Sequence, residues 1–316
     1  MSRRTRASLP RMPERKAVPD IVGDDASPAH GRVAFLGPLG TFSHAAVDRH
    51  FGPDVAKHAV ATIDEVFADV EAGHSAWGVV PVENSTEGAV NNTQDCLIDT
   101  PLVIAAEVII PIEHNLMMRH DTSPEAITRI VSHRQSLAQC RGWLKRHWPQ
   151  VTQQEVSSNA EAARLAAADP STAAIAGERA AALYELDIRE RRIQDQHNNS
   201  TRFLVLGKSH PPATGRDKTS ILVYTEHKPG ALFKVLEPFD RYQVSLTKIE
   251  TRPARDRIWA YVFFIDFEGH IEDKAVQQVF EKLRDCTVKI RNLGSYPVAG
   301  ENPVAGENPV AGENPA

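Results

Sequence analysis

Short apolar runs alternate with helical patterns between residues 32 and 207, and this alternation limits the possible fold more than any other feature. It is typical of α/β domains, so we predict such a domain with a mostly parallel sheet. Capping boxes mark two helix starts, Thr62 with Glu65 and Ser158 with Glu161. Strands are predicted at 33–36, 77–82, 103–112, 130–132, 173–176 and 202–206, and helices at 62–72, 135–147 and 160–168.

The segment 219–296 has a different pattern. Its strand-like and helical runs follow the order βαββαβ, which predicts an α+β ferredoxin-like domain. Strands are predicted at 221–225, 244–249, 258–267 and 288–293, and helices at 230–241 and 272–284. The stretch 208–218 is polar, contains two prolines and a glycine, and is predicted to be a linker.

The two ends of the chain differ from both domains. Residues 1–31 have no periodic apolar pattern, and we expect a disordered tail. An organellar transit peptide is the alternative for so basic a start, but its prolines would interrupt the amphipathic helix that such a peptide needs. Residues 297–316 contain three copies of PVAGEN and are predicted to be a flexible, low-complexity tail.

Composition excludes several classes of partner. The net charge of -5 argues against a nucleic-acid surface, and no apolar run approaches the ~20 residues that span a bilayer. The cysteines Cys96, Cys140 and Cys286 are odd in number and widely spaced, so neither a disulfide framework nor a zinc site is predicted. We expect a cytoplasmic protein with reduced cysteines and no bound metal.

Four polar segments follow or precede predicted strands. GPLGTFSHAA (37–46) permits a tight turn into a helix start that attracts anions, or it is an ordinary connection. PVENSTEGAV (81–90) places a carboxylate, an amide and a hydroxyl at a strand end, where open α/β sheets bind ligands. SHRQSLAQC (132–140) begins at a third strand end, and NSTRFLVLG (199–207) enters the last strand. Each segment taken alone also fits a purely structural role.

In this order and spacing, the segments resemble the prephenate dehydratase family, whose GPxGTFS, PVENS and TRF motifs are present. The resemblance covers 32–296. It includes PGAL (229–232), ETRP (250–253) and FFIDFEGH (263–270), which are similar to an ACT domain. Departures are Thr251 for the usual serine of ESRP, Arg134 for proline, and TQDCL at 93–97, and the last two lie beside the expected site.

The resemblance implies conversion of prephenate to phenylpyruvate without metal or organic cofactor. It implies a two-lobed, periplasmic-binding-protein-like catalytic domain in which the chain crosses near residue 108 and returns near 190. Thr201 is then the essential residue, as a positioned hydrogen-bond donor. Glu83 is a second candidate donor if burial raises its pKa. Arg202 either pairs with a substrate carboxylate or forms a structural salt bridge, and Phe203 packs the cleft floor. Neutral donors to substrate oxygens are Thr41, Ser43, Asn84, Ser85, Ser132 and Gln139.

The ACT resemblance implies phenylalanine binding between paired domains, and therefore a dimer or tetramer. The alternative is a domain that only dimerises. The effector residues are expected to be Gly230, Ala231, Leu232, Glu250, Thr251, Arg252 and Pro253.

Three further alternatives follow from the resemblance. Many family members carry a helical chorismate mutase domain of roughly ninety residues before the dehydratase. Only 31 Pro-rich residues precede Arg32, so we expect no mutase activity in this chain. Arogenate dehydratase is the close alternative, and a non-catalytic amino-acid sensor is the alternative of another class.

Overall fold

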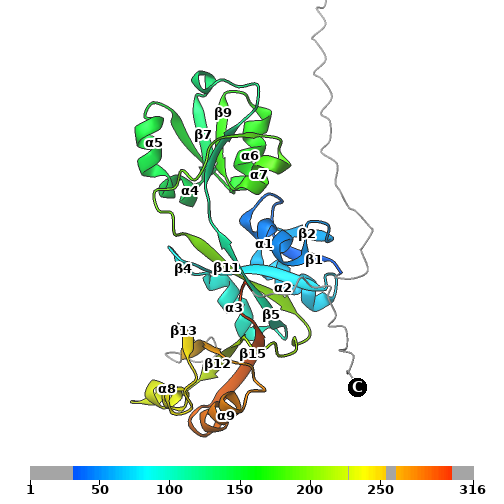
Figure 1. The fold of residues 1–316 in the computed structure, drawn as a ribbon, viewed down its shortest axis with the longest axis vertical. Coiled ribbons are helices and arrows are strands. Elements are labelled where there is room, and N and C mark those ends of the chain that lie inside the picture. The colour runs from blue at the N-terminus through cyan, green and yellow to red at the C-terminus, as the bar shows by residue number, and fades with distance from the viewer. Residues whose placement is uncertain (1–30, 227, 254–260, 301–316) are drawn as a thin grey trace, which may run out of the picture.

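The computed structural model describes residues 31–226, 228–253 and 261–300. Three parts follow one another along its long axis: two lobes and a smaller C-terminal domain (Figure 1). The predicted tails, apart from Gly31 and residues 297–300, lie outside the described residues, as does the start of the strand predicted at 258–267. None of the helices in the described ranges is long and apolar enough to cross a membrane.

Lobe one contains a six-stranded sheet in the order β2-β1-β3-β11-β5, with β4 paired to β3. Thr62 caps the second helix as predicted, because its Oγ1 accepts a hydrogen bond from Glu65 N at 3.2 Å. The strands are β1 (Val33–Leu36), β2 (Lys57–Val60), β3 (Trp77–Asn84), β4 (Gly88–Ala89), β5 (Val103–Pro111) and β11 (Ser200–Gly207), and the helices are α1 (Phe42–Phe51), α2 (Ile63–Ala72) and α3 (Asn91–Asp99).

Lobe two contains a five-stranded sheet in the order β10-β6-β9-β7-β8. Its alanine-rich helix, capped by Ser158 as predicted, packs its small side chains against the sheet. The strands are β6 (Asn115–Met118), β7 (Arg129–His133), β8 (Thr152–Val156), β9 (Thr172–Ala176) and β10 (Asp187–Glu190), and the helices are η1 (Pro124–Ala126, a 3₁₀ turn), α4 (Arg134–Gln139), α5 (Arg141–His147), α6 (Asn159–Ala168) and α7 (Glu178–Leu183).

The single helix predicted at 135–147 is wrong, because the structure breaks it at Cys140 into α4 and α5. The carboxylate of Asp195 accepts hydrogen bonds from Gly142 N at 2.7 Å and Trp143 N at 3.0 Å. These N–H groups belong to the first turn of a new helix, so a residue far along the chain caps α5. No local pattern contains that information.

The prediction of mostly parallel sheets is also wrong. In lobe one, β1 pairs in parallel with β2 and β3, but β11 runs antiparallel to both β3 and β5. Lobe two is likewise mixed. The reason is topological: β5 leads out to lobe two and β11 returns from it, so these neighbouring strands must run in opposite directions.

The two connections between the lobes are displaced from their predicted places. Pairing between β5 and β11 continues to Pro111 opposite Ser200, so the outward crossing lies at 112–114 and not near 108. The return lies between β10 and β11, at 191–199, slightly beyond the predicted 190.

The C-terminal domain has the predicted βαββαβ order and the ferredoxin-like strand order β13-β14-β12-β15. The first strand begins at Asp217, so the link to it is 208–216, two residues shorter than predicted. Asp217 starts the strand early because its carboxylate accepts from Thr214 N and Gly215 N and closes a turn. The elements are β12 (Asp217–Tyr224), α8 (Ala231–Arg241), β13 (Leu246–Pro253), β14 (Tyr261–Glu268), α9 (Lys274–Cys286) and β15 (Lys289–Pro297).

The strands β12 and β14 of the C-terminal sheet are buried on both faces. One face packs against α8 and α9, through residues that include Ile221 and Phe239. The other face places Leu222, Phe264 and Tyr296 in the same hydrophobic cluster as side chains of lobe one. The glycine at 294 lets β15 approach the backbone of Ile104 in β5, where a Cβ would collide. The C-terminal domain is therefore joined to lobe one by a continuous apolar core.

Candidate active site

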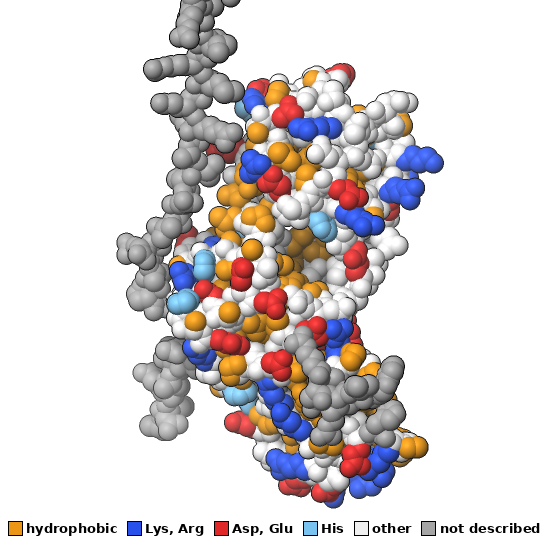
Figure 2. All heavy atoms as spheres, turned by 180° about the vertical axis from the view of Figure 1, so that it is seen from behind, with side chains coloured by type: hydrophobic (Ala, Val, Ile, Leu, Met, Phe, Trp, Pro, Cys, Tyr) orange, Lys and Arg blue, Asp and Glu red, His pale blue; other side chains and the backbone are white. Residues whose placement is uncertain are grey.

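A cavity of about 390 Å³ lies between the two lobes. Both lobes and both connections contribute to it, and Figure 2 shows hydrophobic side chains gathered where the lobes meet. Among its described lining residues none is Asp, Glu, Lys or Arg. The polar lining residues are Thr41, Ser43, Asn84, His114, His133, Gln135, Ser136, Gln139, Ser157, Ser158, Asn159, Asn199 and Thr201. The cavity thus offers neutral hydrogen-bonding groups with no carboxylate to repel an anion.

Six of the predicted residues line this cavity: Thr41, Ser43, Asn84, Gln139, Thr201 and Phe203. They come from all four polar segments. Three of the segments lie on lobe one, and the fourth, which contains Gln139, forms α4 on lobe two. Residues more than a hundred positions apart are thereby brought together. The sequence prediction that the segments face one cleft agrees with this placement.

Thr201 and Asn84 occupy paired positions on β11 and β3. Asn84 Nδ2 donates a hydrogen bond to Thr201 Oγ1 at 2.9 Å. Asn84 Oδ1 accepts from Thr86 N at 3.0 Å and Glu87 N at 3.1 Å. Thr201 is 8% exposed, and no acceptor for its hydroxyl proton occurs among the described residues. Its O–H is therefore free to donate into the cavity.

Two lining residues that the sequence reasoning left unassigned extend this arrangement. Asn199, in the return connection, accepts from Asn84 Nδ2 at 2.8 Å and donates to Gln139 Oε1 at 3.2 Å. His114, in the outward connection, lies with Nε2 2.8 Å from Gln139 Oε1. Burial lowers the pKa of His114 despite its bond to Gln139, so the ring is neutral near pH 7. The sequence feature that could have indicated His114 as a cavity residue is its position just after an apolar strand.

The hydroxyl of Thr41 is occupied by the local structure. It caps α1 by accepting from His44 N at 3.3 Å, and it donates to Pro38 O at 3.0 Å. Ser43 is 6% exposed on the first turn of the same helix. Thr41 and Ser158 thus begin two helices, α1 and α6, whose N-terminal dipoles favour an anion in the cavity.

Two predicted donors lie beside the cavity without lining it. Ser132 is fully buried, with its Oγ 2.6 Å from Ile175 O and 3.0 Å from Asn159 Oδ1. Ser85 Oγ accepts from Ser200 N at 2.9 Å. Both hydroxyls hold neighbouring backbone segments together, so the expectation that they donate to substrate is corrected to a supporting role.

Glu83 and Arg202 are turned away from the cavity, toward the C-terminal domain. Arg202 Nη2 lies 2.9 Å from Asp266 Oδ2, and its Nη1 lies 3.3 Å from Glu107 Oε2. Glu83 Oε2 lies 3.1 Å from Lys248 Nζ and 3.4 Å from Arg202 Nε. Of the two roles left open for Arg202, the structural salt bridge is the one observed. Glu83 is half-exposed and lies between the two cations Arg202 and Lys248, outside the cavity, so it does not fit a donor to the substrate.

Burial alone would raise the pKa of Glu107, but hydrogen bonds from Lys218 Nζ and Ala299 N, with the charges of Lys218 and Arg202, hold that pKa below its usual value. Burial works against the charged form of Arg202 too, yet Asp266, Tyr296 and Glu107 raise its pKa. Glu107 and Arg202 are therefore both charged at this interface.

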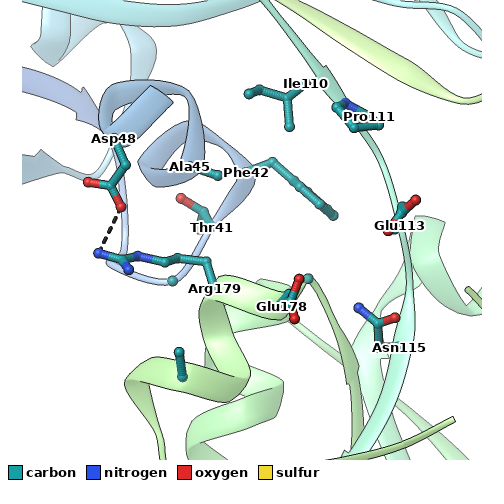
Figure 3. A pocket seen from close by; sticks show the side chains of 13 residues that line it. Thr41, Phe42, Ala45, Asp48, Ile110, Pro111, Glu113, Asn115, Glu178 and Arg179 are labelled. Atoms are coloured by element: carbon teal, nitrogen blue, oxygen red, sulfur yellow. Dashed lines mark ion pairs between the residues drawn. The ribbon is translucent and has the colours of Figure 1, made fainter. Parts of the chain in front are cut away.

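A second hollow, of about 440 Å³, lies between α1, the end of β5 and α7 (Figure 3). Phe42 points into it from lobe one, and the opposite side is lined by Glu113 in the outward connection and Asn115 at the start of β6. Across it, Arg179 Nη2 of lobe two lies 2.7 Å from Asp48 Oδ2 of lobe one. This ion pair ties the lobes together on the side where α1 meets α7.

The predicted effector residues lie on the C-terminal domain. Gly230 adopts φ 75° before α8, a conformation that favours glycine, and Leu232 in the first turn is exposed. On β13, Glu250 pairs with Lys248 at 3.2 Å. Arg252 reaches back to α3, where its Nη2 lies 2.6 Å from Asp95 Oδ1. Ala231, Thr251 and Pro253 are at least partly exposed.

The family model for prephenate dehydratase matches residues 33–211, more than half of the chain and all of the cavity lining. The chain belongs to the prephenate dehydratase family. A second model, that of the ACT domain, matches residues 219–285. As a family member the chain is an enzyme, a dehydratase with a C-terminal ACT domain, and the resemblance seen in the sequence is confirmed.

Relatives and solved structures agree with the family. A bifunctional chorismate mutase/prephenate dehydratase of Pseudomonas aeruginosa is 51% identical over 268 residues, which cover 85% of this chain and 73% of that protein. The prephenate dehydratase of Bacillus subtilis is 34% identical over 279 residues, covering 84% and 98%. The crystal structure of prephenate dehydratase from Arthrobacter aurescens in complex with L-Phe has a TM-score of 0.79 at 34% identity, covering 86% and 91%.

Proposed function

We propose that the cleft converts prephenate to phenylpyruvate, carbon dioxide and water, and that phenylalanine bound by the ACT domain regulates this reaction. In the reaction, the bond from the ring to the leaving carboxylate breaks, and its electron pair completes the aromatic ring. The ring C–O bond breaks at the same time, and the departing hydroxide takes up a proton and leaves as water. Aromatisation supplies the driving force, so the protein must bind a dianion and assist the poor leaving group.

The free O–H of Thr201 is the observation that carries this proposal. Because Asn84 donates to Thr201 Oγ1, the hydroxyl proton of Thr201 points to the substrate and hydrogen bonds to the departing oxygen. Assistance of this kind contributes typically 10²–10⁴-fold. Gln139 supplies a neutral donor, and the starts of α1 and α6 supply positive dipole ends, for the carboxylates.

The test is release of phenylpyruvate by the purified chain with prephenate, and in parallel with arogenate, the close alternative substrate. We expect the rate on prephenate to exceed the rate on arogenate. Faster turnover of arogenate would reassign the substrate. A protein that binds these compounds but converts neither would favour an amino-acid sensor.

For regulation, the ion pairs at the interface supply a physical route. Lys248 on β13, two residues before the ETRP motif, contacts Glu83, which directly precedes Asn84. Asp266 on β14 holds Arg202, which directly follows Thr201. A shift of β13 or β14 on phenylalanine binding would therefore move the backbone that carries the Asn84–Thr201 pair. By linkage, phenylalanine and substrate must affect each other's binding equally.

Lys248→Met tests this route. We expect phenylalanine to inhibit the variant several-fold less than wild type while binding with similar affinity by calorimetry. Lys274→Met, on the exposed side of α9, is the matched control and should be inhibited as wild type. Unchanged inhibition in Lys248→Met would remove this contact from the route.

Self-association through the ACT domain completes the proposal. Large hydrophobic side chains are exposed on this domain: Leu232, Phe233, Leu246, Ile249, Tyr261 and Val288. Phe233 is 72% exposed, and covering such groups with a second copy would stabilise a dimer or tetramer. Light scattering on wild type and Phe233→Ser tests this, and a monomeric wild type would contradict it.

A further inference from the structure

Five polar side chains form a continuous row across the cleft. The row runs from Thr201 and Asn84 on lobe one, through Asn199 in the return connection, to Gln139 on lobe two and His114 in the outward connection. Both lobes and both connections between them contribute to the row. The separations along the row are 2.9, 2.8, 3.2 and 2.8 Å.

The direction of every hydrogen bond in this row is determined at one end. Thr86 N and Glu87 N are backbone donors, so the atom of Asn84 that faces them must be the oxygen. Its Nδ2 then donates to Asn199, whose own oxygen must face Asn84. Asn199 Nδ2 consequently donates to Gln139, so the atom of Gln139 that faces Asn199 and His114 is also the oxygen.

The tautomer of His114 follows from the same chain. Since Gln139 Oε1 can only accept, the neutral ring must carry its proton on Nε2 and donate it to Gln139. The amide N–H₂ of Gln139 then points away from the row, and Gln139 Nε2 is a buried atom with no partner among the described residues. A buried donor without a partner costs about 1–3 kcal/mol, so an oxygen from a ligand is the expected partner.

We propose that His114 is a positioning residue that holds Gln139 so that its Nε2 amide donates to a carboxylate oxygen of the substrate. This inference rests on the proposed function. His114 is itself 2% exposed, and its ring packs edge-on against Phe42, with ring centroids 5.9 Å apart, so it has little freedom to turn. Burial also favours the neutral state of the ring.

The experiment compares three substitutions of His114 in the full chain by steady-state kinetics on prephenate. His114→Phe keeps the contact with Phe42 and removes the donor. His114→Gln places an amide N–H where the histidine Nε2–H lies, whereas His114→Asn places its amide at the position of Nδ1. His147→Phe, on the exposed side of α5, is the matched control.

We expect His114→Phe to raise the KM for prephenate roughly tenfold, as loss of one charge-assisted hydrogen bond would, with kcat within about threefold of wild type. His114→Gln should restore most of the KM, and His114→Asn should not. Because His114 acts through Gln139, the double variant with Gln139→Leu should have a KM within about twofold of the worse single variant.

An unchanged KM in His114→Phe, or equal rescue by Gln and Asn, would overturn the positioning role. Additive KM increases in the double variant would do the same. A wild-type chain that does not convert prephenate would instead overturn the proposed function, so the two failures are distinguishable. If His114→Phe does not fold, the comparison of the Gln and Asn variants still decides the question.

Discussion

Asn84 Nδ2 donates a hydrogen bond to Thr201 Oγ1 across 2.9 Å, and two backbone N–H groups hold the Asn84 amide in that orientation. A threonine hydroxyl can donate once and accept twice. Since Asn84 occupies an accepting position, the single proton of Thr201 remains available for the substrate. The relationship determines the direction of the hydrogen bond that the Thr201 hydroxyl can donate, which neither residue determines alone.

Removal of the Thr201 hydroxyl should abolish the assistance to the leaving group. We expect Thr201→Ala to lower kcat at least a hundredfold with folding intact, and Thr201→Ser to retain most of the activity. Steady-state kinetics and circular dichroism check this. Thr152→Ala, on the exposed strand β8, is the control and should leave kcat unchanged. A Thr201→Ala variant within tenfold of wild type would refute the donor role.

Reversal of the Asn84 hydrogen bond should be nearly as damaging. In Asn84→Asp the atom facing Thr201 becomes an acceptor, so the Thr201 proton turns to the carboxylate and away from the substrate. The new negative charge also repels a dianion. We expect kcat/KM to fall at least a hundredfold. Asn198→Asp, at an exposed position of the return connection, should have little effect on kcat/KM. An equal fall in kcat/KM for the two variants would contradict the argument.

Asp266 should matter for stability, because it is the nearest of the three carboxylates that face the buried charge of Arg202. Breaking one partner of a buried ion pair costs about 3–5 kcal/mol. Asp266→Asn should therefore lower the urea midpoint markedly. Asp121→Asn breaks a surface pair with Arg119 and should cost less than about 1 kcal/mol. Equal midpoints for the two variants would show that the interface pair is not needed for stability.

Stability should also depend on His44, which lies buried between Gly40 and Asp48. Burial lowers the pKa of His44 to about 4, against 6.5 for the ordinary value. The folded pKa lies below the unfolded pKa, so the stability that the neutral ring contributes is fully present above pH 6.5. As the pH falls toward 4, the free energy of unfolding decreases by roughly 3 kcal/mol.

His44→Asn tests this by thermal unfolding between pH 7 and pH 4. The asparagine oxygen can still accept from Gly40 N, as His44 Nδ1 does at 3.0 Å, but it does not titrate. We expect the variant to lose less stability than wild type over this range. His147→Asn, an exposed histidine, should follow the wild-type curve, and so should His44→Asn if the assignment is incorrect.

Much of the fold was predictable from local patterns. The caps at Thr62 and Ser158 and the βαββαβ order of the C-terminal domain are found as predicted. The predictions that depended on distant contacts were wrong. Asp195 breaks a predicted helix from more than fifty residues away, and the returning strand β11 makes the sheet of lobe one mixed.

The candidate site divides in the same way. The polar segments and their family resemblance were present in the sequence, and they indicated Thr201, Asn84 and Gln139. His114 was not assigned, because a histidine in a connection has no periodic pattern to mark it. Glu83 was assigned to the cleft although its neighbour Asn84 is the residue that lines it.

By itself the sequence determined the order of elements, the helix caps and the chemical types of residue available for the reaction, because these depend on near neighbours and on composition. The tertiary structure decided which of two adjacent residues faces the cavity. Alternation along a strand separates Thr201 from Arg202 and Asn84 from Glu83, but it does not say which face is the cleft. That choice is made by the ACT domain, whose Asp266 and Lys248 bind the charged member of each pair and leave the neutral member to the cavity.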